Sequence, residues 1–106
     1  MTALLSQEQF EELLKSPKPA PLAIVYFTAK WCGPCKAMKL GKVLDAHTGI
    51  DWYLCDMDDN DYTPGYCGVK SIPSFLAIIN GKPFTPIYKQ SDADKVIEWV
   101  SAIKDL

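Results

Sequence analysis

The chain has 106 residues and a formal net charge of −2, with 48% hydrophobic and 23% charged residues. This composition is ordinary for a soluble globular protein, and the length predicts a single domain over residues 1–106. No basic block favours nucleic acid or an anionic membrane, and no apolar run approaches the roughly 20 residues of a membrane span. The first residues lack the pattern of a secretory signal, so we expect a cytoplasmic protein without nucleic-acid or membrane partners.

The first quarter of the chain predicts a strand, a helix and a second strand. Residues 2–5 are expected to form a short strand, and Ser6 followed by Gln9 has the pattern of a helix N-terminus. The proline-rich stretch 15–21 should end that helix. Residues 22–27 are continuously apolar and rich in β-branched and aromatic side chains, which indicates a strand buried on both faces.

The middle of the chain predicts a helix, a strand and an acidic turn region. The apolar spacing from Cys35 to about His47 suits one helix. Residues 51–57 indicate a strand, on which Cys55 is expected to be a small buried apolar side chain. Residues 58–67 are acidic and rich in turn formers, with room for one short helix.

The last third predicts a hairpin followed by a helix. Residues 74–79 indicate a strand, and Asn80-Gly81 is a strong hairpin signal that pairs this strand with residues 84–88. Ser91 is expected to cap a final helix whose apolar residues recur at helical spacing. Strands joined by helices, together with one antiparallel hairpin, predict an α/β fold with a mixed sheet covered on both faces.

Two cysteines, Cys32 and Cys35, follow the apolar strand in the segment Lys-Trp-Cys-Gly-Pro-Cys-Lys, residues 30–36. If Cys32 is the N-cap of the next helix, Gly33 and Pro34 take the first two helical positions, where proline is tolerated. Because proline has no N–H, the capping hydrogen bond to the Cys32 sulfur must come from the Cys35 N–H. This bond and the helix dipole favour a thiolate at Cys32 and lower its pKa.

Cys32 and Cys35 occupy different positions at the start of the predicted helix, and this predicts different roles for the two thiols. Cys32, at the more exposed end, is expected to attack a substrate disulfide. Cys35, one turn further in and more buried, is expected to resolve the mixed disulfide. Trp31 is a candidate apolar platform beside the sulfurs, with ordinary packing as the alternative. Lys36 is a candidate source of positive potential that tunes the thiol pKa, with a plain surface lysine as the alternative.

A zinc site is the metal-binding alternative for a C-x-x-C pair. Zinc needs two more ligands, usually from a second paired motif, whereas Cys55, Cys67 and His47 lie in different predicted elements. The acidic run 56–61 lacks the glycine and the distal glutamate of a calcium-binding loop. We therefore expect no metal and no cofactor other than the redox-active cysteine pair.

With Trp-Cys-Gly-Pro-Cys after a buried strand and Ser-Ile-Pro-Ser-Phe at residues 71–75, the chain resembles the thioredoxin family over nearly all of its length. The resemblance implies a four- to five-stranded mixed sheet and reduction of protein disulfides, with electrons from a thioredoxin-reductase-like donor. Pro73 matches the family's cis-proline, and the backbone of Ile72 is expected to pair with a substrate strand. We expect a monomer. The candidate substrate contacts are Trp31, Gly33, Pro34, Ile72 and Pro73.

The chain departs from the family pattern at several positions. Tyr26 stands where the family usually has a buried aspartate that assists proton transfer at the resolving cysteine, and a tyrosine hydroxyl is a poor base at neutral pH. We therefore expect a different pH dependence. Leu40 replaces a proline that kinks the active-site helix, and Gly41 is a candidate for supplying some of that bend. Lys89 lies near a family glycine and should shift substrate choice toward acidic partners.

Two other functions stay open from the sequence. The same chemistry can run in an oxidant or isomerase, although Gly-Pro between the cysteines resembles the reducing members of related families. A redox-independent binding module would use the fold as a subunit or clamp and dispense with the thiols, because a fold does not by itself determine function. Replacing Cys32 and Cys35 by serine separates these classes, since a binding role survives both changes.

Overall fold

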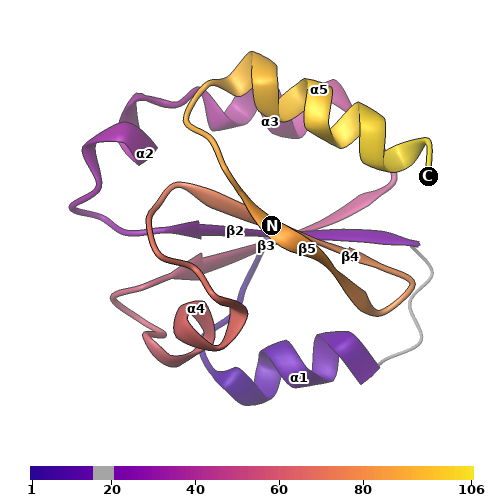
Figure 1. Cartoon of the computed structure of the whole chain (residues 1–106). Coiled ribbons are helices and arrows are strands. Elements are labelled where there is room, and N and C mark those ends of the chain that lie inside the picture. Colours follow the sequence, from indigo (N-terminus) through magenta and orange to yellow (C-terminus); the bar gives the residue numbers. More distant parts are fainter. Residues whose placement is uncertain (16–20) are drawn as a thin grey trace.

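The computed structural model of the chain describes residues 1–15 and 21–106, so most of the proline-rich stretch expected to end the first helix lies outside it. Five strands form one mixed sheet in the order β1-β3-β2-β4-β5 (Figure 1). β2 runs parallel to β3 and antiparallel to β4. The strands are β1 (Thr2–Ala3), β2 (Leu22–Thr28), β3 (Ile50–Asp56), β4 (Ser74–Ile79) and β5 (Lys82–Lys89).

Helices cover both faces of the sheet, as the sequence predicts (Figure 1). One face carries α1 (Gln7–Lys15) and α4 (Tyr62–Cys67), and the other carries α2 (Gly33–Ala37), α3 (Leu40–Ala46) and α5 (Ala93–Lys104). Within the described residues, no helix combines the length and the apolar character needed to cross a bilayer. Each face of the sheet buries a hydrophobic cluster of its own against these helices.

β2 is the central strand because its side chains are apolar on both faces. Residues 22–27 are all buried. Ile24 and Tyr26 enter the cluster beneath α3 and α5, whereas Val25 and Phe27 enter the cluster beneath α1. Complete burial of a large apolar side chain contributes roughly 1.5–3 kcal/mol. The strand that leads directly into the cysteine motif is therefore held from both sides.

The prediction of a single helix over residues 35–47 is wrong, because the chain breaks there into α2 and α3. Met38 adopts an extended conformation, with φ −72° and ψ 135°. Its side chain is buried in the cluster beneath α3 and α5, and this burial offsets the helical hydrogen bonds lost at the break. The break comes before Leu40, so the kink forms without a proline there. Gly41 lies inside α3 and does not supply the bend.

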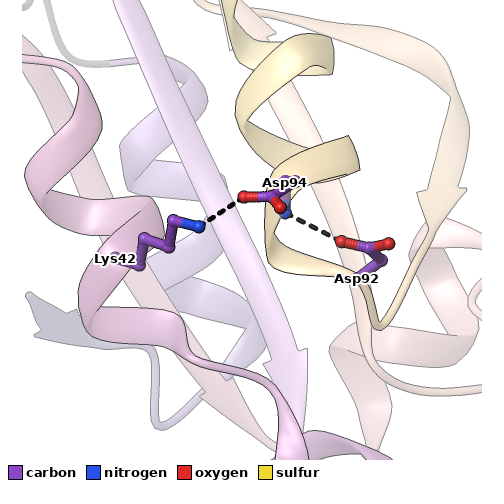
Figure 2. Close-up of polar contacts among 3 residues, drawn as sticks. All are labelled: Lys42, Asp92 and Asp94. Carbon is purple, nitrogen blue, oxygen red and sulfur yellow. Dashed lines mark hydrogen bonds and ion pairs between the residues drawn. The ribbon is translucent and has the colours of Figure 1, made fainter.

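The last helix begins at Ala93, and its N-cap is Asp92 instead of the predicted Ser91. The Asp92 carboxylate accepts a hydrogen bond from the Asp94 N–H at 2.9 Å, and an ionised acceptor at this position also suits the helix dipole. Asp94 pairs in turn with Lys42 of α3 at 2.6 Å (Figure 2). The hydrogen bond to Asp94, followed by its charge, raises the pKa of Lys42. Both side chains are exposed, so the pair contributes little to stability.

β4 and β5 form the predicted hairpin through Asn80 and Gly81. Their φ angles are 53° and 79°, which is the pair of positive values that a type I′ turn requires. β5 is an edge strand, and its register with β4 shifts between Phe75 and Ala77. Prolines 83 and 86 in β5 have no N–H to offer another strand, so this edge resists further pairing.

Two glycine variants test the backbone of the hairpin and of α3. Gly81→Ala should destabilise the protein by about 1–2 kcal/mol, because a side chain at positive φ is strained. Its Cβ would also lie 3.0 Å from the Leu14 carbonyl oxygen. Gly41→Ala is the matched control, since its Cβ meets nothing within 4 Å inside a helix. It should stabilise the protein by about 0.5–1 kcal/mol. Urea unfolding followed by circular dichroism measures both, and equal effects would contradict this description.

Candidate active site

Cys32 and Cys35 lie just after β2, at the start of α2, and form a disulfide with their Cα atoms 5.3 Å apart. Cys32 is the N-cap of α2, and the Cys35 N–H points at the Cys32 sulfur with an N···S distance of 3.1 Å. This is the capping geometry predicted from the sequence. When the disulfide is reduced, the same N–H is in place to stabilise a negative charge on the Cys32 sulfur.

The predicted difference in exposure between the two cysteines is wrong for this disulfide-bonded form. Cys32 is 4% exposed and Cys35 is 7% exposed. Both pack in a small cluster with Ala29, against which Met57 and Ile72 also lie. The Ile72 carbonyl oxygen is 3.8 Å from the Cys32 sulfur and covers it. The difference between the two cysteines in this structure is therefore the capping position of Cys32 and not its exposure.

The loop before β4 faces the disulfide. The peptide bond between Ile72 and Pro73 is cis, Pro73 is fully buried and Ile72 is partly exposed. Across the described chain, the backbone of Ile72 makes no hydrogen bond in a turn, loop or strand. The Gln90 N–H donates to the Pro73 carbonyl at 3.3 Å, which brings the end of β5 to this loop.

A groove of about 340 Å³ opens where this loop, α2 and the end of β5 meet. Three of the residues that line it were predicted as site residues. The other three are the last residue of β5 and the two residues after it, and among these the sequence singles out Lys89 for substrate choice. Gln90 and Ser91 were not foreseen as part of a site, and the only signal for them was their position directly after Lys89. The groove is lined by Pro34, Ile72, Pro73, Lys89, Gln90 and Ser91.

Trp31 stands outside this groove and is 67% exposed. Its Nε1 donates a hydrogen bond to Asp58 Oδ1 at 3.0 Å, and the Asp58 N–H donates to Asp56 Oδ1 at 2.9 Å. The indole is therefore fixed to the loop after β3 while most of its surface faces solvent. Ordinary core packing does not describe this side chain. Gly33 and Lys36 are also exposed, at the two ends of the short helix α2.

Tyr26 belongs to a different cluster from the cysteines. It is 3% exposed, and its ring stacks on Phe75 with centroids 5.0 Å apart. Burial raises the pKa of the Tyr26 hydroxyl, and a weaker opposite effect comes from its hydrogen bond with Thr28. The hydroxyl therefore stays protonated at neutral pH and cannot act as a base there.

The other two cysteines are free thiols. Cys55 is fully buried on β3, as predicted, and Cys67 is partly buried at the end of α4. Burial raises the pKa of Cys55 to about 12 and that of Cys67 to about 11. In the part of the chain that the structure describes, no three His, Cys, Asp or Glu side chains are grouped to hold a metal ion.

A cysteine pair that closes a disulfide at a helix N-terminus, on a sheet covered by helices, defines a dithiol–disulfide oxidoreductase. The family model described as Thioredoxin matches residues 1–102. Thioredoxin-1 of Caenorhabditis elegans is 32% identical over 101 residues, which cover 91% of this chain and 87% of that protein. The chain belongs to the thioredoxin family.

Other relatives agree with this assignment. A chloroplastic M-type thioredoxin of Brassica napus is 34% identical over 83 residues, covering 74% of this chain but only 45% of that longer protein. The oxidised mitochondrial thioredoxin 3 of Saccharomyces cerevisiae superposes with a TM-score of 0.81 at 27% identity, covering 100% of this chain and 95% of the yeast chain. The fold is thus shared with thioredoxins from different compartments.

Thiol labelling tests the placement of the four cysteines. In the reduced, folded protein at pH 7, iodoacetamide should label Cys32 and leave Cys55 and Cys67 unlabelled, because the thiolate is the nucleophile and buried thiols stay protonated. Mass spectrometry of the labelled peptides measures this, with the unfolded protein in urea as the control in which all thiols react. Rapid labelling of Cys55 in the folded state would contradict its burial.

The same two pKa values predict how stability depends on pH. Cys55 and Cys67 ionise near pH 8.5 when the chain is unfolded, and only near their raised pKa values when it is folded. Their contribution to stability should therefore be complete below about pH 8.5 and lost as the pH rises toward 11 to 12. Urea unfolding across this range measures the loss, which should be smaller in Cys55→Ala than in the parent protein.

Proposed function

We propose that the protein acts in the reducing direction and transfers two electrons from the Cys32–Cys35 dithiol to disulfides of other proteins. The observation that carries the exchange chemistry is the N-cap geometry, in which the Cys35 N–H points at the Cys32 sulfur at 3.1 Å. That contact stabilises the attacking thiolate and also places Cys35 where it can close the internal disulfide. The reducing direction rests on the dipeptide between the two cysteines. The Gly-Pro dipeptide between them resembles the reducing members of related families.

The reaction balances as two exchange steps. The Cys32 thiolate attacks one sulfur of a substrate disulfide, forms a mixed disulfide and releases the other substrate sulfur as a thiolate. Cys35, after losing its proton, attacks the Cys32 sulfur and releases the second substrate thiolate, so that the Cys32–Cys35 disulfide forms again. The substrate gains two electrons, and its two thiolates take up protons from water. A thioredoxin-reductase-like donor then returns two electrons to this disulfide.

The free backbone of Ile72 is the proposed docking point for the substrate chain. Its carbonyl oxygen lies 3.8 Å from the Cys32 sulfur, so a strand paired with Ile72 brings its own cysteine close to the attacking atom. Pro73, Gly33 and Pro34 border the same region, and the exposed indole of Trp31 offers an apolar platform. Lys36 is proposed to add positive potential to α2. No metal takes part in the proposed reaction.

Two free cysteines support a reducing compartment for the protein. Cys55 and Cys67 are unpaired, and such thiols persist where the surroundings keep them reduced. We propose a cytoplasmic, monomeric protein in which residues 1–106 act as one thioredoxin-like domain. Size-exclusion chromatography with light scattering tests the monomer, because a dimer would double the measured mass.

Cysteine variants and the reduction potential test the proposed reaction. With dithiothreitol as the electron source, reduction of insulin should fall to the uncatalysed background in Cys32→Ser. Cys35→Ser should instead trap a mixed disulfide with the substrate, visible as a mass adduct that a reductant removes. The potential of the pair should lie near the value known for thioredoxin, about −270 mV.

A potential of about −180 to −120 mV would favour an oxidant or isomerase. A partner interaction that survives both serine variants, with no insulin reduction by the parent protein, would favour a binding module. Cys55→Ala is the matched control, because it removes a thiol outside the proposed site and should leave insulin reduction unchanged.

Tyr26 variants test the proton chemistry. We propose that the thiols exchange protons with water, because a neutral hydroxyl replaces the carboxylate that the family usually places here. Tyr26→Phe should therefore leave the pH dependence of insulin reduction unchanged from about pH 6 to 9, below the range where tyrosine titrates. Tyr26→Asp should add a new ionisation to the profile. A profile shifted by Tyr26→Phe would show that the hydroxyl itself tunes the thiols.

A further inference from the structure

The groove beside the disulfide adjoins Ile72, the docking point proposed above for a substrate chain. Ile72 lines it, and the carbonyl oxygen of the same residue lies 3.8 Å from the Cys32 sulfur. A segment that brings a sulfur to Cys32 therefore places the side chains next to its own cysteine over this groove. The identity of the lining residues then decides which neighbouring side chains are favoured.

Lys89 is held at this groove by the backbone around it. It pairs with Ser74 in the register of β5 against β4, and the next residue, Gln90, donates its N–H to the Pro73 carbonyl at 3.3 Å. Figure 1 shows that the chain leaves β5 on the side of the sheet where α2 lies. The ammonium group is therefore carried by a strand end fixed beside the disulfide, while the side chain itself is exposed.

Lys89 is the only charged residue among those that line the groove. In residues 1–15 and 21–106, no carboxylate lies within ion-pair distance of it. Asp58, the carboxylate that the site holds in place, accepts its hydrogen bond from Trp31 and does not neutralise Lys89. Among the described residues, the groove thus presents a positive charge that has no ion-pair partner.

We infer that Lys89 selects substrates that carry an aspartate or glutamate beside the reactive cysteine. This inference rests on the reducing function proposed above. An exposed ion pair is worth at most about fivefold in binding, so acidic substrates should be favoured over neutral ones by up to about fivefold in kcat/KM. The preference should weaken with added salt, because the charges are exposed to solvent.

The test uses disulfide-linked fluorogenic peptides that differ only at the residue next to one cysteine, which is Glu, Gln or Lys. Each substitution is made separately on the N-terminal and on the C-terminal side of the cysteine. The rate constant kcat/KM is measured at low salt and at high salt. Each value is divided by the rate with dithiothreitol alone, which removes the effect of the charge on the peptide's own thiol chemistry.

The protein variants are Lys89→Glu and Lys89→Gln, with Lys82→Glu as the matched control. Lys82 is exposed at the other end of the same strand, so its substitution changes the net charge equally without touching the groove. The parent protein should favour the Glu peptide at one flank. Lys89→Gln should lose that preference, Lys89→Glu should reverse it, and Lys82→Glu should keep it.

The outcomes distinguish a failure of the specificity inferred for Lys89 from a failure of the reducing function on which it rests. If all peptides are reduced at equal normalised rates, or if Lys89→Glu keeps the parent ranking, the specificity assigned to Lys89 is wrong and the reducing function stands. If no peptide is reduced faster than by dithiothreitol alone, the reducing function is wrong and the inference falls with it. Circular dichroism of each variant confirms that a changed preference does not come from unfolding.

Discussion

Burial of β2 on both faces is the constraint on which the rest of the structure depends. The strand has no polar face to turn to water, so helices must cover the sheet from both sides. Its C-terminal end leads directly into the turn that begins α2. Cys32 lies just past that point and is positioned by the strand behind it and by α2 in front. The reactive pair therefore sits on a fixed support, as a precise site requires.

The site is assembled from segments far apart in the chain, and backbone contacts hold them together. The turn into α2 supplies Cys32 and Cys35, the loop before β4 supplies Ile72, and the end of β5 supplies Lys89. Pairing of β4 with β5 keeps the last two segments together. β2 leads into the cysteines and β4 follows the Ile72 loop, so the hydrogen bonds between β2 and β4 set the distance between these two parts of the site.

Local patterns predicted most of the fold, and errors arose where long-range packing decides. Continuous apolar runs identified the central strands, and Asn80-Gly81 identified the hairpin, since both signals lie within a few residues. The predicted helix over 35–47 is too long, because no local pattern shows that burying Met38 in the core stabilises the chain more than continuing the helix would. Within the site, the Cys32 cap follows from the missing N–H of proline. The contact between the Ile72 carbonyl and Cys32 does not follow from any local pattern, because it joins residues 40 positions apart.

The prolines of β5 also affect how long a substrate protein remains bound. A sheet edge with free N–H groups can pair with strands of other chains and retain them. Here one edge strand has only two residues, and the other carries Pro83 and Pro86, which have no N–H groups. If a substrate pairs at Ile72 as proposed, its backbone contacts are confined to that short stretch, where few hydrogen bonds can form. A substrate held by so few hydrogen bonds would depart once its covalent link to Cys32 is cut, which favours rapid turnover over capture.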